Sequence, residues 1–205
     1  MMDNSDPLKK YRNEFYFPKH SNGEEAIYLC GNSLGLQPKS AKSHIDAVLD
    51  GWRDLGVKGH FEGNHPFTTY HESLGEKMAR IVGGKKEEVV AMNSLTVNLH
   101  LMLVSFYRPQ KNRFKILIEK NAFPSDQYAV KSQLEFHGYD PQTALLELEP
   151  RAGEDILRTE DILELIKNKG KEIALIMIGG LNYYTGQAFE MEKITQAGHQ
   201  MGCTV

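Results

Sequence analysis

The spacing of apolar positions changes near residue 84 of this chain. Before that point, apolar side chains recur about every 3.6 residues, which predicts one helix over residues 38–55 and a second over residues 71–82. A proline enters the first helix and two glycines end the second. The stretch 58–69 between them lacks this spacing, so we expect a loop there.

Beyond residue 84, short apolar runs alternate with amphipathic stretches. The runs predict buried strands and the stretches predict helices. In chain order we expect strand 88–92, helix 95–107, strand 114–119, helix 124–137, strand 144–148, helix 159–169 capped by Thr159 and ended by Gly170, strand 173–178 and helix 190–202. This alternation predicts an α/β fold in which helices flank a mainly parallel sheet, preceded by a helical N-terminal segment.

The last three residues, 203–205, have the composition of an opening strand. We therefore expect the sheet to continue past the end of this chain, so that the α/β domain is truncated. The alternative is a short natural edge strand. In either case, ligands of such a sheet bind at the carboxyl ends of its strands, so we expect the functional residues there.

Composition narrows the class of protein. The chain is 40% hydrophobic and 25% charged, which is typical of a globular protein, and its net charge of −3 favours neither a nucleic acid nor an anionic membrane as partner. Two widely separated cysteines and scattered histidines favour neither a disulfide framework nor a metal site. With no signal peptide and no long apolar run, we expect a cytoplasmic protein.

The first strand-to-helix junction, residues 93–96, reads Asn-Ser-Leu-Thr. The backbone N–H groups of a helix start and the hydroxyls of Ser94 and Thr96 suit a phosphate. The glycine-rich motifs of dinucleotide and nucleoside triphosphate sites are absent from the sequence. The alternative is that these hydroxyls only cap the helix.

The second junction combines an aromatic ring with a carboxylate. Phe123, Pro124, Ser125 and Asp126 follow the strand 114–119 and open the next helix. Together with a phosphate site at a neighbouring junction, they would suit a flat, phosphorylated heteroaromatic such as pyridoxal phosphate (PLP). Alternatively, Phe123 is a hydrophobic staple and Asp126 a solvated acid of the first helical turn.

A third junction, residues 179–187, begins with two glycines that allow a ligand to approach the backbone. Its two tyrosines could line a pocket or simply pack against other side chains. Among the histidines, His60 and His65 lie in the expected loop and are better placed to meet a substrate than the others.

Four motifs at these places carry a resemblance. They are residues 29–38 (LCGNSLGLQP), 92–100 (MNSLTVNLH), 123–126 (FPSD) and 184–187 (YTGQ). In this order they resemble the kynureninase family of fold type I, aspartate-aminotransferase-like PLP enzymes, and the likeness covers nearly the whole chain. It implies hydrolysis of L-kynurenine or 3-hydroxy-L-kynurenine to an anthranilate and L-alanine, in tryptophan catabolism and NAD biosynthesis.

The resemblance also implies roles for particular residues. The cofactor phosphate would be held by Leu95 and Thr96, the pyridine ring would stack on Phe123, its surroundings would be completed by Pro124, Ser125 and Asp126, and substrate would meet Ser33 and His60. Gly179 departs from the family, which has another cofactor-contacting hydroxyl at that place.

The family's lysine that bonds to PLP and the aspartate that faces the pyridinium nitrogen would both lie beyond residue 205, so no catalytic residue is assigned within the chain and we expect it to be inactive alone. The resemblance further implies a homodimer, with residues 1–70 as an N-terminal segment carrying substrate-facing loops and residues 71–205 as the first part of the PLP-binding large domain. Two alternatives stay open. One is another fold type I enzyme, such as a cysteine desulfurase, against which the FPSD and YTGQ motifs argue; the other is a non-catalytic binding module.

Overall fold

The computed structural model describes residues 5–205, which form two compact units that divide between Met92 and Asn93. The first four residues of the expected N-terminal segment lie outside this range. The expectation that the large domain begins at residue 71 stays a prediction. Each unit is described by itself.

The first unit is helical in its described part. Its elements are the 3-10 helix η1 (Lys9–Glu14), α2 (Ala41–Leu55), the 3-10 helix η2 (Gly56–His60), α3 (Glu72–Val82) and the 3-10 helix η3 (Lys86–Glu88). Helices α2 and α3 confirm the two predicted from apolar spacing, and α3 ends at Gly83 in the left-handed conformation that glycine favours. The expected loop is partly wrong, because its first residues continue η2.

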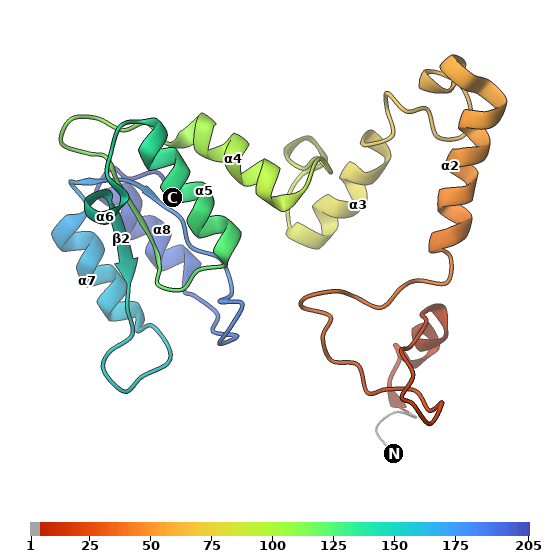
Figure 1. Cartoon of the computed structure of the whole chain (residues 1–205), viewed down its shortest axis with the longest axis horizontal. Coiled ribbons are helices and arrows are strands. Elements are labelled where there is room, and N and C mark those ends of the chain that lie inside the picture. The colour runs from red at the N-terminus through yellow and green to blue at the C-terminus, as the bar shows by residue number, and fades with distance from the viewer. Residues whose placement is uncertain (1–4) are drawn as a thin grey trace. The chain divides into compact units, whose positions relative to one another are not determined.

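The second unit alternates helices and strands, as the sequence predicts (Figure 1). Its elements are α4 (Leu95–Phe106), β1 (Lys115–Glu119), α5 (Pro124–Phe136), α6 (Pro141–Ala144), β2 (Leu145–Leu148), α7 (Thr159–Lys169), β3 (Ile173–Ile176) and α8 (Met191–Gln200). The three strands are parallel in the order β2-β1-β3. Thr204 forms an isolated parallel bridge to Leu175 of β3, and the expectation that the sheet continues beyond residue 205 stays a prediction.

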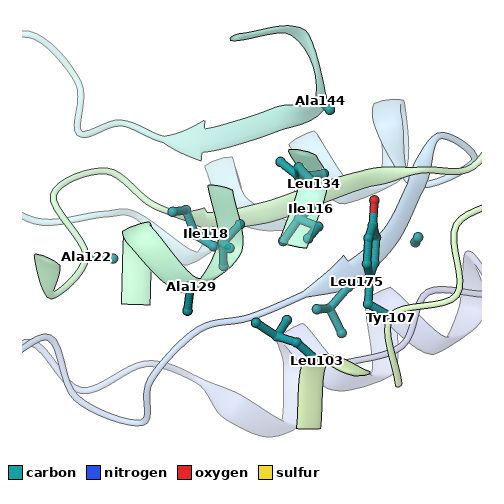
Figure 2. Packing of buried hydrophobic residues seen from close by; sticks show 11 residues of the cluster. Leu103, Tyr107, Ile116, Ile118, Ala122, Ala129, Leu134, Ala144 and Leu175 are labelled. Atoms are coloured by element: carbon teal, nitrogen blue, oxygen red, sulfur yellow. The ribbon is translucent and has the colours of Figure 1, made fainter. Parts of the chain in front are cut away.

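Helices cover both faces of this sheet. On one face, Ile116 and Ile118 of β1 pack against Leu103 of α4 and Ala129 and Leu134 of α5 (Figure 2). On the other face, a second cluster joins the sheet to α7 and α8; it contains Leu117, Ile162, Ile166 and Ile194. Alternate residues of β1 therefore face opposite helical layers, which is the arrangement that a buried parallel strand requires.

Two local expectations are wrong. Residues 89–92 form no strand, although 88–92 were expected to; a 3-10 helix ends at Glu88 and the backbone after it has no strand pairing among residues 5–205. Thr159 does not cap α7: Arg158 holds the N-cap position, and its side chain forms no capping hydrogen bond. Gly170 does follow the end of α7, as expected.

Candidate functional site

Two strand ends of the second unit lie side by side at the carboxyl edge of the sheet. Strand β1 ends at Glu119 and its parallel neighbour β3 ends at Ile176. After β1 the chain turns through Asn121, whose φ of 57° is left-handed, and enters α5 at Pro124. The segments that follow β1 and β3 therefore face the same region of space.

Phe123 occupies the N-cap position of α5, and Pro124 takes the first helical position. Proline restricts the residue before it to extended backbone, and Phe123 has φ −52° and ψ 135°. Phe123 is 50% exposed, and its ring lies nearly perpendicular to the ring of Tyr183, with centroids 5.1 Å apart and an interplanar angle of 77°. A half-exposed ring at the rim of a strand end is available to a flat ligand.

Ser125 and Asp126 occupy the first turn of α5 and are partly buried. The Ser125 hydroxyl donates a hydrogen bond to Asp126 Oδ1 at 3.2 Å, and the Asp126 backbone N–H donates to the Phe123 carbonyl at 2.9 Å. The Asp126 carboxylate thus lies at the positive end of the helix, where a negative charge is stabilised.

Glu119 was not singled out by the sequence. It closes the central strand with only 7% of its surface exposed, and the backbone N–H groups of Glu119 itself and of Gly179 lie near its carboxylate, where they favour the charged form. Burial raises the pKa of Glu119, and the nearby charge of Asp126 raises it further. A charged residue at the end of an apolar strand was the available signal.

Gly179 lies where the segment after β3 meets the end of β1. Its backbone N–H meets the Glu119 carboxylate, so the Glu119–Gly179 pair joins the segment after β3 to the end of β1. The Phe123–Tyr183 ring pair is a second link between the same segments. The structure thus brings the second and third predicted junctions together.

Leu95 and Thr96 form the first turn of α4 and are exposed. Ser94 is the N-cap residue, but its side chain forms no capping hydrogen bond, so it leaves the first-turn N–H groups to other acceptors. Helix α4 packs on α5, the helix that the second junction opens. The role of Leu95 and Thr96 toward a phosphate stays a prediction.

Ser33 and His60 belong to the first unit. Ser33 lies in an exposed turn, where its backbone N–H donates to the Cys30 carbonyl at 3.0 Å. The His60 ring lies edge-on to the Phe67 ring, with centroids 5.8 Å apart. Their roles toward a substrate also stay predictions.

Within residues 5–205, no three His, Cys, Asp or Glu side chains gather as a metal ion would require. None of the helices in that range has both the length and the apolar character needed to cross a membrane.

No protein-family model matches the chain. Curated relatives do match it over its whole length. It is 57% identical over 204 residues to kynureninase of Koribacter versatilis and 58% identical over 204 residues to that of Myxococcus xanthus, each match covering 48% of the relative. It is 45% identical over 215 residues to kynureninase of Rattus norvegicus, covering 46% of it. The chain spans about half the length of the curated relatives it matches.

Solved structures share its fold. A cysteine desulfurase from Thermococcus onnurineus matches with a TM-score of 0.58 and 18% identity, over 96% of this chain and 44% of the other. The cystine C-S lyase C-DES, in complex with cysteine persulfide, matches with a TM-score of 0.63 and 14% identity, over 93% and 44%. At these identities the likeness concerns the fold alone. From the sequence matches, the chain is homologous over its whole length to about half the length of these kynureninases.

Proposed function

We propose that this chain works as part of a kynureninase, which hydrolyses L-kynurenine or 3-hydroxy-L-kynurenine to anthranilate or 3-hydroxyanthranilate and L-alanine in tryptophan catabolism, a route that also leads to NAD. The observation that carries this proposal is identity of 45–58% to kynureninases along the entire chain. By the same homology, we propose a cytoplasmic homodimer. Residues 1–70 would supply substrate-facing loops, and residues 71–205 the first part of the large domain.

The residues of the second unit fit PLP as cofactor. Phe123 offers a half-exposed ring, Ser125 and Asp126 lie beside it at a helix start, and the first turn of α4 has no side-chain cap. We assign the cofactor phosphate to Leu95 and Thr96, the face of its ring to Phe123, and its edge to Pro124, Ser125 and Asp126. When bound, PLP supplies the electron sink for breaking the substrate's carbon-carbon bond.

The protein's own residues then have the task of orienting and enclosing the cofactor and the substrate. A cofactor ring stacked on Phe123 is held in one plane. The backbone N–H groups at the start of a helix attract the negative charge of a phosphate. We assign Ser33 and His60 to binding of the substrate.

An assay of the whole protein tests this proposal. With saturating PLP and L-kynurenine, we expect fluorescent anthranilate to accumulate together with L-alanine in equal amounts. L-cysteine is the matched second substrate, because a cysteine desulfurase also releases L-alanine but forms no anthranilate. Release of alanine from cysteine alone would favour that enzyme, and no product from either substrate would favour a non-catalytic module.

Thr96→Ala and Phe123→Ala should each weaken PLP binding in the whole protein, measured by equilibrium dialysis. Tyr128→Ala is the matched control, since Tyr128 lies on the exposed side of α5. Unchanged PLP affinity in both site variants would overturn the assignment of these residues.

A further inference from the structure

The segment after β3 folds into a compact hairpin. Leu181 and Ala188 form an antiparallel bridge, and the Asn182 backbone N–H donates to the Gln187 carbonyl at 2.9 Å. Gly186 donates back to the Asn182 carbonyl at 3.0 Å and has a left-handed φ of 72°. A loop closed by backbone hydrogen bonds at its base keeps its tip residues in defined positions.

The tip of the hairpin is fixed by a side chain of its own. Asn182 Oδ1 accepts hydrogen bonds from the backbone N–H groups of Tyr184 and Thr185, at 3.0 and 2.9 Å. This is the turn geometry that asparagine side chains form with the residues that follow them. Tyr183 therefore lies between a fixed Asn182 and a fixed turn.

Gln187 ties the hairpin to a different part of the unit. Its Oε1 accepts from the Leu157 backbone N–H at 2.9 Å, and its Nε2 donates to the Leu157 carbonyl at 2.5 Å. Leu157 lies between β2 and α7 and is buried, so the anchor is rigid. The hairpin is thus connected to β3 at its first residue, and its second arm is held to Leu157 through Gln187.

What this anchored hairpin presents to the candidate site is the ring of Tyr183. Phe123 and Tyr183 are each 50% exposed, and their rings meet nearly at a right angle. A perpendicular partner contacts one edge or one face of the phenyl ring and leaves another face free. The contact restricts rotation of Phe123 without covering the surface that a flat ligand would use.

We propose that Tyr183 is a positioning residue for PLP: its ring, carried by the anchored hairpin, fixes the plane in which Phe123 receives the cofactor. This inference rests on the proposed function, because it presumes that PLP stacks on Phe123. Tyr183 touches Phe123 and acts on the cofactor only through it. The hydroxyl of Tyr183 has no part in this role.

The test is a double-mutant cycle on PLP affinity in the whole protein. We expect Tyr183→Ala to raise the PLP dissociation constant about two- to tenfold, the range implied by measured coupling of aromatic pairs. Tyr183→Phe keeps the ring and should bind PLP as the unaltered protein does. In a Phe123→Ala background, Tyr183→Ala should have no further effect. Tyr128→Ala controls for loss of a tyrosine near α5.

The near-ultraviolet circular dichroism of bound PLP is the second readout. It should change in Tyr183→Ala, because it reports the orientation of the cofactor ring, and should be restored in Tyr183→Phe. Equal losses of affinity with and without Phe123 would overturn the inference, as would a Tyr183→Phe variant as weak as Tyr183→Ala.

A further cycle, on denaturant unfolding of the apoprotein, separates the inference from the proposed function. If the unaltered protein binds no PLP, the proposed function fails and with it the role of Tyr183 toward the cofactor. The cycle still tests the physical basis of that role, since additive effects of Phe123→Ala and Tyr183→Ala on unfolding would show that the rings do not restrain each other.

Discussion

Glu119 offers a test of how the carboxyl end of the central strand is built. Glu119→Gln removes the charge and keeps a carbonyl oxygen that can accept the Gly179 N–H. Glu119→Ala removes the acceptor as well. Because Gly179 is exposed and water can reach it, we expect that loss to cost about 1 kcal/mol of unfolding free energy, the lower end of the range for an unpaired group.

The charge itself has a pH-dependent effect. Burial raises the native pKa of Glu119, so between its unfolded pKa, about 4.3, and its native pKa the native state binds more protons than the unfolded state. The free energy of unfolding therefore falls as the pH rises through that window, by at most about 1.4 kcal/mol per pH unit for one proton. Below the unfolded pKa the carboxyl is neutral in both states and the penalty disappears.

Urea unfolding of the unaltered protein and of Glu119→Gln, measured at a series of pH values from roughly 4 to 8, checks this reasoning. The variant lacks the titrating group, so its stability relative to the unaltered protein should increase with pH across the window and then stay constant. Glu135→Gln, on the exposed side of α5, is the matched control and should follow the unaltered protein. Parallel curves for Glu119→Gln and the unaltered protein would refute the raised pKa.

Two further predictions concern packing. Tyr107 is fully buried and its hydroxyl donates to the Phe114 carbonyl at 2.6 Å, so Tyr107→Phe should lower the free energy of urea unfolding by about 1 kcal/mol; an unchanged midpoint would contradict this. Gly170→Ala would bring a Cβ within 2.5 Å of the Ile166 carbonyl oxygen and should destabilise by about 1–3 kcal/mol, seen as a lower Tm. Gly51 lies inside α2, and apart from its chain neighbours and the backbone of its own helix no atom lies within 4 Å of its Cβ position, so Gly51→Ala should instead stabilise by about 0.5–1 kcal/mol. A Gly51→Ala variant as strongly destabilised as Gly170→Ala would contradict the steric explanation.

The helices and strands of the second unit were predictable because their signals are local. Pro124 at the first helical position of α5 and the buried run of β3 each identify an element without knowledge of the rest of the chain. The run 88–92 misled because a short apolar segment becomes a strand only beside a partner, and residues 89–92 have none among residues 5–205. The cap of α7 was placed one residue late, at Thr159 instead of Arg158, since helix ends depend on backbone angles that composition does not specify.

The candidate site was predictable in its parts but not in its assembly. Phe123 and Asp126 could be identified from an aromatic and an acid at a helix start. Sequence order alone, however, led us to pair their junction with the preceding one, at Thr96. That pairing stays a prediction. The structure adds contacts with the segment after β3, at Gly179 and Tyr183, because β3 lies next to β1 in the order β2-β1-β3. That order depends on a crossover connection, which no local pattern encodes.

Strand register explains why these contacts form where they do. The pairing of β1 with β3 shifts by one residue at its start, since Lys115 lies opposite Ile173 but Ile116 lies opposite Leu175. The pairing ends at Leu117 and Ile176, and the same register extended by two residues would place Glu119 level with Ile178, one residue before Gly179. Without the shift, Glu119 would lie opposite Met177, and every later side chain of β3 would meet β1 from the other face of the sheet. The one-residue irregularity at the start of the pairing therefore determines which residue of the segment after β3 lies beside Glu119, namely Gly179. It likewise determines where along β1 the hairpin begins, and so the position of Tyr183 relative to Phe123.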